Sequence, residues 1–463
     1  MQGLKIRCVS VDEFLGDCRH YTLTTHLASH HSLDGPVIAY DISRLFIGPL
    51  FSTPRGIDRV DLALAREVFA DPDSANQGIL PTPWGVRAYP SVYVRRMLDK
   101  LEHLWCEHIP ASGDPILHQL IAHFSDPAAH QLCLPFPSSL TLTVRFRRVF
   151  DLLRATTLKF GRSARREVPK GAIYLNVGQL GLAIPAFHYW LKDRPDVTCA
   201  LMLHDVIPIE HPHLVSTAAV AHHARMVRTV ARHADCLIFN SAHAQERIND
   251  ALRSHGRIGV PSVVRWLPLP AAFAEAVGSR PELAETHYFI VVSTIEPRKN
   301  HDLLIRVWRR LIKRMGAAAP HLIIVGARGY RSAETLEQLE LEPLLRSRIH
   351  VISGLSSPGL ADLVLGAAAM LSPSFVEGFG LPVLEANAMG VTAIVSDIAA
   401  HREISGPATI LLPVDDECAW EQAILQIAPV GIRSRPAIPS NLTEGAYCAD
   451  LLAFLKRSAG GRV

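Results

Sequence analysis

Short apolar runs alternate with amphipathic stretches along most of this chain. In its first half the apolar runs occupy residues 36–43, 172–178, 198–205 and 235–241, and each ends in a turn or a polar residue. Runs of this kind, separated by helical patterns, predict parallel strands joined by helices. The polar ends of such strands face the ligand in open α/β sheets. We therefore expect an α/β domain that binds its ligand along the edge where these strands end.

A second alternating series follows residues 267–285, which are rich in proline and alanine and predict a linker. Its apolar runs lie at 287–294, 321–327, 349–353, 368–374 and 391–396, and helical patterns lie between them at 301–315 and 357–369. Two doubly wound, Rossmann-like domains facing each other across a cleft account for both series. We place the first domain at residues 1–270 and the second at 285–432.

Residues from about 70 to 170 lack this alternation and contain long helical stretches, which predicts a helical insertion in the first domain. Within it, residues 145–170 carry nine Lys or Arg against two acidic residues, with apolar residues interleaved. One interpretation is a basic amphipathic helix that lies on an anionic membrane surface. The other is a solvated basic helix that packs by its apolar stripe.

The composition narrows the class of protein. The chain has 463 residues, of which 48% are hydrophobic and 20% charged, so it is globular and long enough for two or three domains. A net charge of +3 argues against a nucleic-acid binder. Eight cysteines without a C-x-x-C pair suggest neither a zinc ribbon nor a disulfide framework. With no apolar leader and no stretch long enough to span a bilayer, we expect a cytoplasmic protein, soluble or peripheral on the cytoplasmic membrane face.

The most informative stretch is residues 372–397. Glu377 ends a loop after an apolar strand, and the following Gly-Phe-Gly supplies backbone that can approach a ligand closely. Pro382 marks a helix start, which places Glu385 in the first helical turn. A glycine loop at a helix N-terminus suits a diphosphate, whereas two carboxylates suit hydroxyls of an attached sugar and ribose. The alternative is that the carboxylates only complement the helix dipole.

The phrase SPSFVEGFGLPVLEA resembles the retaining glycosyltransferases of family 4, which have the GT-B fold and a signature of two Glu separated by seven residues. Glu377 and Glu385 have this spacing. The resemblance implies that Glu377 contacts the donor sugar and that Glu385 binds the nucleotide ribose. It also implies that the last residues, 433–463, form a helix that crosses back to the first domain. The residues between the two carboxylates that we assign to substrate binding are Gly378, Phe379, Gly380 and Leu381.

A second motif, VVSTIEPRKNHDLLI, runs from a strand into a helix and places Arg298 and Lys299 at the turn. Two cations there can neutralise charge on a departing nucleotide diphosphate without a metal, although solvated turn cations are the alternative. The phrase resembles mannosyltransferase-like members of the family. Thr294 stands where many members have an Arg, so we expect Arg298 to replace that guanidinium. Glu296 is either a pairing partner or a loop cap.

In the first half, His204 and Asp205 follow a strand at a point where the family places a His near the donor sugar. A buried structural histidine is the alternative. Since the leaving phosphate takes the acceptor proton in front-face substitution, we expect His204 to position the sugar. Gly56 and Arg59 resemble the family's glycine loop and helix start near the diphosphate, although an ordinary turn glycine and a surface arginine also fit.

Other polar residues have structural explanations. Ser241 is predicted to cap the helix that follows it. His222 and His223 are adjacent, and neighbouring positions on a helix diverge by about 100°. We therefore predict no metal site at these histidines. Gly326 ends a strand, which is a weak indication of a loop that faces the nucleotide.

Together these features predict a metal-independent, retaining glycosyltransferase. It is expected to transfer a hexose, with mannose from GDP-mannose as the leading donor, to a lipid-linked or polysaccharide-precursor acceptor. The alternatives are rhamnose or glucose from another nucleotide donor, or a noncatalytic sugar-nucleotide-binding subunit of a polysaccharide assembly complex. No cofactor is expected besides the nucleotide sugar itself. The expected partners are the donor, the acceptor and an anionic membrane surface at residues 145–170, but no nucleic acid.

Overall fold

The computed structural model contains two α/β halves, each built on one sheet. It describes residues 36–48, 56–105, 109–125, 142–155, 161–276, 280–284, 286–429 and 436–460. Residues 36–463 form one unit. We refer to residues 36–276 as the N-terminal half and to residues 280–429 as the C-terminal half.

The C-terminal half has a six-stranded parallel sheet with the order β11-β10-β9-β12-β13-β14. Its strands are β9 (Tyr288–Val292), β10 (His321–Val325), β11 (Ile349–Ile352), β12 (Ala369–Ser372), β13 (Ala393–Ser396) and β14 (Thr409–Leu412). The central strands are almost wholly apolar and buried, as expected for a sheet covered on both faces. The strand order reverses between β9 and β12, and open α/β sheets bind ligands at such a switch point.

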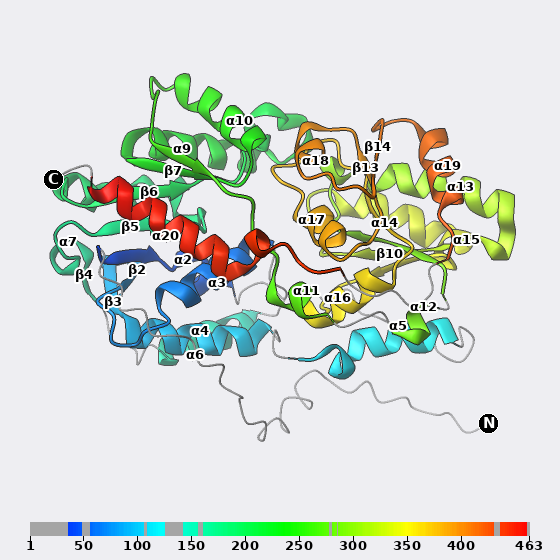
Figure 1. The fold of residues 1–463 in the computed structure, drawn as a ribbon, viewed down its shortest axis with the longest axis horizontal. Coiled ribbons are helices and arrows are strands. Elements are labelled where there is room, and N and C mark those ends of the chain that lie inside the picture. The colour runs from blue at the N-terminus through cyan, green and yellow to red at the C-terminus, as the bar shows by residue number, and fades with distance from the viewer. Residues whose placement is uncertain are drawn as a thin grey trace. The chain divides into compact units, whose positions relative to one another are not determined.

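Helices connect these strands (Figure 1). They are α13 (His301–Met315), α14 (Ser332–Leu341), α15 (Pro343–Arg346), α16 (Ser357–Gly366), α17 (Leu381–Ala388), α18 (Ala399–Glu403) and α19 (Glu417–Gln426). Helix α13 is strongly amphipathic, and its apolar face buries Trp308 against Phe289 of β9 with ring centroids 5.9 Å apart. The amphipathic pattern at residues 301–315 therefore predicts this helix correctly.

The N-terminal half has an eight-stranded sheet with the order β4-β3-β2-β1-β5-β6-β7-β8. Its strands are β1 (Ile38–Asp41), β2 (Gln77–Thr82), β3 (Gly85–Pro90), β4 (Arg162–Ser163), β5 (Ile173–Asn176), β6 (Thr198–Met202), β7 (Cys236–Phe239) and β8 (Ser262–Val264). The strands from β2 through β1 to β8 run parallel. The predicted architecture of two Rossmann-like, doubly wound domains, as in the GT-B fold, is therefore confirmed.

The predicted helical insertion at about 70–170 is only partly correct. Strands β2 and β3 lie within it, and they extend the main sheet as a hairpin beside β1. These strands were missed because Gly78, Pro81, Gly85 and Pro90 interrupt the apolar pattern. The remaining elements of the insertion are mainly helical: α4 (Ser91–Trp105), α5 (Pro115–Ser125), α6 (Leu142–Ala155) and α7 (Ala164–Glu167).

Helices α5 and α20 are among the elements that link the halves (Figure 1). Helix α5 of the insertion lies against α12 (Pro281–Ala284), and the carboxylate of Asp114, just before α5, accepts a hydrogen bond of 2.7 Å from the backbone N–H of Ser356 before α16. Helix α20 (Glu444–Gly460), which follows the C-terminal half, packs on α3 (Gly56–Val68) and β6. The hydroxyl of Tyr447 in α20 approaches the sulfur of Met202 in β6 at 4.0 Å. The last helix thus covers the N-terminal half.

Among the helices of the described residues, none combines the length and the apolar character that crossing a bilayer requires.

The core of the C-terminal half offers a test of packing. The Trp308 side chain is fully buried, and its indole N–H donates to the Pro320 carbonyl at 2.9 Å. Trp308→Phe removes that donor and leaves both a small void and an unpaired carbonyl. We expect it to lower the free energy of unfolding by about 2–4 kcal/mol, measured as the loss of helical circular dichroism on urea titration. Trp84→Phe, at a side chain that is 64% exposed, is the matched control and should change it by less than about 0.5 kcal/mol.

Candidate active site

The site forms at the switch point of the C-terminal sheet, where β9 and β12 end side by side. A 3-10 turn at Pro297–Lys299 follows β9, and the loop that carries Glu377 follows β12. Asn300 has a left-handed backbone conformation (φ 53°), and its side-chain amide donates to the carbonyls of Pro373 and Val414. This amide ties the β9 turn to the β12 loop and so fixes how the two approach each other.

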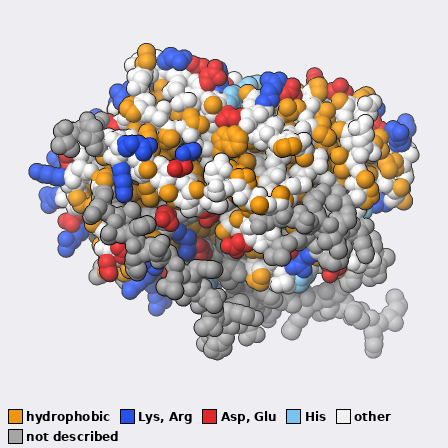
Figure 2. Space-filling view, viewed as in Figure 1, with side chains coloured by type: hydrophobic (Ala, Val, Ile, Leu, Met, Phe, Trp, Pro, Cys, Tyr) orange, Lys and Arg blue, Asp and Glu red, His pale blue; other side chains and the backbone are white. Residues whose placement is uncertain are grey.

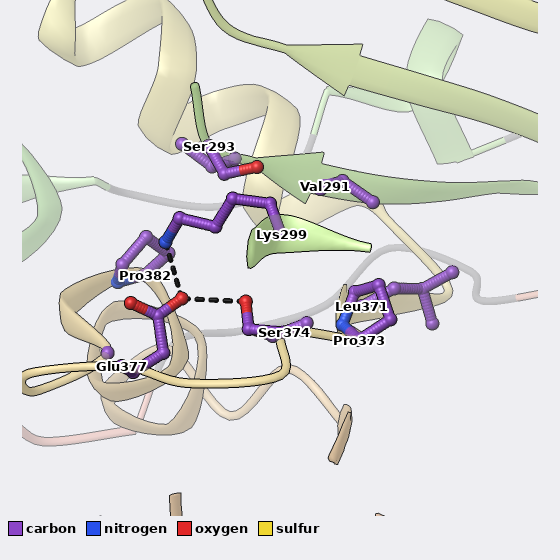
Figure 3. Close-up of a pocket in the computed structure, with 11 residues that line it drawn as sticks. Val291, Ser293, Lys299, Leu371, Pro373, Ser374, Glu377 and Pro382 are labelled. Carbon is purple, nitrogen blue, oxygen red and sulfur yellow. Dashed lines mark hydrogen bonds and ion pairs between the residues drawn. The ribbon is translucent and has the colours of Figure 1, made fainter. Parts of the chain in front are cut away.

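The Glu377 carboxylate lies between two cations. Lys299 Nζ pairs with Oε1, Arg298 Nη1 lies 3.1 Å from Oε2, and the Ser374 hydroxyl donates to Oε1 at 2.7 Å. Figure 3 shows Lys299 and Glu377 pointing toward each other, with the Ser374 hydroxyl bound to the same carboxylate oxygen as Lys299. The small cavity beside this ion pair has a volume of about 10 Å³, and its lining includes Val291, Ser293, Pro373 and Pro382.

The charge state of the Glu377 side chain follows from these contacts. Burial alone would raise the pKa of Glu377, but the charges of Lys299 and Arg298 outweigh it and hold that pKa far below its usual range. Burial and the repulsion of Arg298 lower the pKa of Lys299, although Glu377 opposes this shift. The Glu377 carboxylate is therefore ionised near neutral pH, and two cations are held at the end of β9.

Glu296 is a pairing partner rather than a loop cap. Its Oε1 lies 2.6 Å from Arg298 Nε, and its side chain makes no capping hydrogen bond at the turn that follows. Arg298 is thus bound on both sides by carboxylates. Thr294 lies elsewhere: a Cβ placed on Gly329 would come within 2.6 Å of the Thr294 methyl group. The structure therefore brings Arg298, Lys299 and Glu377 together, and places Thr294 against a neighbouring loop.

The glycine loop approaches the N-terminal half. A Cβ placed on Gly378 would lie 2.9 Å from Asp205 Cβ, and the Ser241 hydroxyl donates to the Gly378 carbonyl at 3.2 Å. Gly380 has φ +97°, a conformation that favours glycine, and α17 begins at the next residue, Leu381. The Phe379 ring is buried, with its centroid 6.5 Å from that of Trp266. Close backbone packing between the halves requires a glycine at position 378.

Glu385 lies in the second turn of α17, not in the first as the sequence analysis expects, because the helix starts at Leu381. Its side chain is 1% exposed, and Oε1 has no hydrogen-bond partner among the described residues. Burial raises the pKa of Glu385 to about 7, although the charge of Arg59 lowers it in part. Arg59 belongs to α3 of the N-terminal half, so the two halves bring these predicted residues near each other.

Gly56 is the first residue of α3, and a Cβ placed on it would lie 3.2 Å from the Leu381 side chain. The start of α3 therefore packs against the start of α17. The loop before Gly56, at residues 49–55, lies outside the described residues. Packing leaves no room for a side chain at Gly326, since a Cβ there would come within 1.8 Å of the Ser293 carbonyl oxygen.

His204 follows β6 and is buried, with Nε2 3.0 Å from the Val177 carbonyl. Burial lowers the pKa of His204 to about 4, so the ring is neutral near pH 7. A neutral ring that donates from Nε2 to Val177 leaves Nδ1 as an acceptor, and Nδ1 has no partner among the described residues. Asp205 accepts a hydrogen bond from the backbone N–H of Ile207 at 3.1 Å. His204 is thus fixed by its contact with Val177, and its Nδ1 is a buried acceptor.

The sequence indicates some of the contacts around this site and misses others. Ser241 caps α10 (Ala242–Arg253) as predicted, accepting from Ala244 N–H at 2.9 Å. Beside it, the Glu403 carboxylate of α18 accepts from the backbone N–H groups of Ala242 and His243 at 2.7 and 3.0 Å. Nothing in the sequence indicates this contact, because it joins helices from different halves. Ser374, beside Glu377, was also missed.

Across the described ranges, no three or more His, Cys, Asp or Glu side chains gather as ion ligands. At the switch point itself, the groups available to oppose negative charge are Lys299 and Arg298.

Part of the chain matches a known protein family. Residues 286–428 match the family model described as glycosyl transferases group 1. The serotype-specific mannosyltransferase WbdA of Escherichia coli is 26% identical over 217 residues, which is 44% of this chain and 26% of WbdA. The O-antigen chain mannosyltransferase B of E. coli is 31% identical over 161 residues, or 35% of this chain and 42% of that protein. The chain thus matches about a quarter of WbdA and less than half of mannosyltransferase B.

Among solved structures, HepE from Anabaena in complex with UDP has a TM-score of 0.42 and 16% sequence identity, over 63% of this chain and 74% of that one. The family match covers the sheet, turn and loop that hold Lys299, Glu377 and Glu385. The C-terminal half is accordingly a domain of the glycosyl transferases group 1 type, with mannosyltransferases among its relatives.

Proposed function

We propose that this protein is a retaining glycosyltransferase that moves a hexose from a nucleotide diphosphate sugar to a saccharide or lipid-linked saccharide acceptor. The observation that carries this proposal is the pairing of Lys299 and Arg298 with Glu377 at the switch point between β9 and β12. Two cations and a glycine loop suit a diphosphate, and a permanently ionised carboxylate suits a sugar hydroxyl. The family match over the same residues supports this assignment.

In the proposed reaction, the bond between the sugar C1 and the diphosphate oxygen breaks, and its electron pair goes to the leaving diphosphate. The acceptor hydroxyl forms the new bond on the same face of C1 and gives its proton to a diphosphate oxygen. Lys299 and Arg298 stabilise the charge that develops on the leaving group, which is the role of preorganised cations in such sites. No metal is needed for this step because two fixed positive charges stand at the leaving group.

A diphosphate at the end of β9 would compete with Glu377 for Lys299. Once the diphosphate takes over the pairing with Lys299, Glu377 can accept a hydrogen bond from a donor-sugar hydroxyl. Glu385 accepts from the ribose, and Nδ1 of His204 accepts from the sugar across the site. Gly56, Arg59, Asp205 and Thr294 remain assigned to substrate binding through the family resemblance, and Thr294 has the least support because it packs against Gly329.

The donor we favour is GDP-mannose. This choice rests on the EPRKN phrase and on relatives that are named as mannosyltransferases. Rhamnose or glucose from another nucleotide is the alternative donor, and a noncatalytic sugar-nucleotide-binding subunit is the alternative function. We place the protein in the cytoplasm, at the inner face of the membrane.

The first test concerns Glu377. Glu377→Gln removes the charge but keeps the size of the side chain, so transfer of mannose from GDP-mannose should fall by roughly 10²-fold or more. Binding of GDP should persist or become tighter, because Lys299 loses its competing carboxylate. Transfer is measured by radiolabelled product and binding by calorimetry.

Glu334→Gln is the matched control, since Glu334 pairs with Arg331 on the surface, and it should leave both quantities unchanged. Undiminished transfer in Glu377→Gln would contradict the assignment. If the unaltered protein binds nucleotides but transfers no sugar from any donor screened, the noncatalytic alternative replaces the enzyme.

The second test uses the pKa of Glu385, which is about 7. A ribose hydroxyl that donates to this carboxylate favours the ionised form, so donor affinity should rise as pH increases through 7. If only the ionised form binds, the affinity should be roughly tenfold higher at pH 8 than at pH 6. Calorimetry with the nucleotide sugar measures this, because its diphosphate is a diester and does not titrate between these pH values.

In Glu385→Gln the side chain cannot titrate, and the affinity should be flat across the same range. An equal pH dependence in both proteins would show that another group causes it.

The third test addresses the membrane surface. The Phe146 and Phe150 side chains of α6 are 71% and 53% exposed, one turn apart, while Arg147 and Arg154 on the same helix are also exposed. Leu152 is buried, so the helix packs on the protein by another face. Residues 156–160 of the predicted basic segment lie outside the described residues. An apolar pair flanked by cations is the pattern of a helix that binds an anionic membrane surface.

Phe146→Ser combined with Phe150→Ser should reduce sedimentation with phosphatidylglycerol-containing vesicles by roughly tenfold, since each ring contributes burial energy at the interface. Leu341→Ser combined with Leu344→Ser removes two comparably exposed apolar side chains from the C-terminal half and serves as control. Equal losses of vesicle binding in both double variants, or no loss in either, would contradict the proposal that α6 binds the membrane surface.

A further inference from the structure

A second cavity lies in the N-terminal half, away from the proposed donor site. Its volume is about 300 Å³, which is within the range of small-molecule sites. It is lined by Leu191, Lys192, Arg194, Pro195, Val197, Cys199, Arg232, His233 and Asp235. These residues come from three places: the end of a 3-10 helix (Pro185–Asp193) and the residues just after it, the start of β6, and the end of α9 (Thr217–His233) with the turn that leads to β7. We name it the Lys192–Arg232 cavity.

The Lys192–Arg232 cavity opens at the opposite edge of the sheet from the proposed donor site. Val197 and Asp235 come just before β6 and β7, whereas His204 and Asn240 come just after the same strands. With about 3.3 Å per residue, the seven residues from Val197 to His204 separate the two edges by roughly 20 Å. A ligand in this cavity would therefore not contact the proposed catalytic residues.

Positive charge that is not matched by protein contacts gathers around the cavity. Lys192 and Arg232 are exposed, and neither forms an ion pair with a carboxylate in the part of the chain that the structure describes. Lys192 Nζ lies 5.0 Å from the centroid of the Tyr189 ring. Arg194, by contrast, is fully engaged with the Asp196 carboxylate and with backbone carbonyls. Lys192 and Arg232 are therefore the cations that a ligand could recruit.

The pKa of His233 indicates that Lys192 and Arg232 lie close to its ring. Burial and, after it, the repulsion of His188, Arg232 and Lys192 together lower the pKa of His233 to about 4, while Asp235 opposes them. Asp235, which lines the cavity, accepts a hydrogen bond of 2.8 Å from the backbone N–H of Cys199. Lys192 and Arg232 thus place two positive charges beside His233, and Asp235 is the carboxylate among the residues that line the cavity. An anion among them would relieve their mutual repulsion.

The surrounding surface adds further positive charge. Helix α7 packs against the 3-10 helix that ends at Asp193, and Arg165 of α7 pairs with Asp193 at 3.3 Å. The C-terminal part of the basic segment noted in the sequence, residues 161–170, therefore lies next to the Lys192–Arg232 cavity. Figure 2 shows Lys and Arg side chains gathered at the edge of the molecule where Figure 1 places α7 and β4. A field of this sign attracts anions toward the cavity.

We propose that the Lys192–Arg232 cavity is a second anion site that binds a phosphate group of a small phosphorylated molecule or of a lipid headgroup. Lys192 and Arg232 bind the phosphate oxygens, and His233 donates to them in its protonated form. The apolar wall of Leu191, Pro195 and Val197 accommodates the organic part of the molecule. The size of the cavity and the small number of free cations suit one phosphate group and not a polyanion.

The test uses inorganic phosphate alone as the probe. The ring resonances of His233, assigned with a His233→Gln variant, should shift in a saturable way on titration, and the pKa of His233 should rise when phosphate is bound. Lys192→Gln combined with Arg232→Gln should weaken the binding by roughly tenfold or more, as expected for loss of charged hydrogen bonds. Arg228→Gln changes an exposed arginine one turn earlier on α9 that does not line the cavity, and it should have less than a twofold effect.

Two further arms separate the sources and the sites. Vesicles of phosphatidylcholine with phosphatidic acid, compared with phosphatidylcholine alone, show whether a headgroup produces the same shift of His233. Glu377→Gln should leave the His233 response unchanged, so this site and the proposed donor site can fail independently. The proposal is overturned if neither millimolar phosphate nor the acidic vesicles shift His233, or if the double variant binds phosphate as well as the unaltered protein.

Discussion

The buried, ionised carboxylate of Glu377 joins the β9 turn to the β12 loop in the C-terminal half. Glu377 is almost inaccessible to water, so its ionised form is tolerated only because Lys299, Arg298 and the Ser374 hydroxyl surround it. These partners stand on the β9 turn and the β12 loop, and the backbone N–H of Phe375 donates to the Arg298 carbonyl at 2.9 Å between the same segments. The ion pairs and the strand ends thus fix each other, and the polar site exists because the apolar sheet brings both ends together.

Two carboxylates eight positions apart have opposite environments. Glu377 is paired and its pKa is held far below the usual range, whereas Glu385 is buried, Oε1 has no hydrogen-bond partner in the described ranges, and its pKa is raised to about 7. Environments that push two pKa values apart assign different roles to chemically identical groups. Glu377 supplies a constant negative charge, and Glu385 can gain or lose its charge near neutral pH as a ligand hydroxyl approaches.

Local sequence patterns predicted what depends on local structure. The buried strands, α13, the cap at Ser241 and the turn that carries Lys299 were all readable, because each follows from periodicity or from a short motif. The start of α17 was misjudged by one residue, because the helix begins at Leu381, directly after Gly380 in its left-handed conformation, and not at Pro382. The β2–β3 hairpin was missed because its glycines and prolines resemble a loop, and only pairing with β1 makes it part of the sheet.

Contacts between the halves were beyond prediction, yet they bear directly on the site. Glu403 reaches the N-terminus of α10, where the helix dipole and free N–H groups favour a carboxylate, and Trp266 Nε1 lies 3.2 Å from the same group. Ser241, at that helix start, also donates to the Gly378 carbonyl. Since Gly378 is the neighbour of Glu377 in the chain, any displacement of the halves must strain or break contacts one residue from the central ion pair. The α10 N-terminus therefore joins the N-terminal half to the loop that carries Glu377.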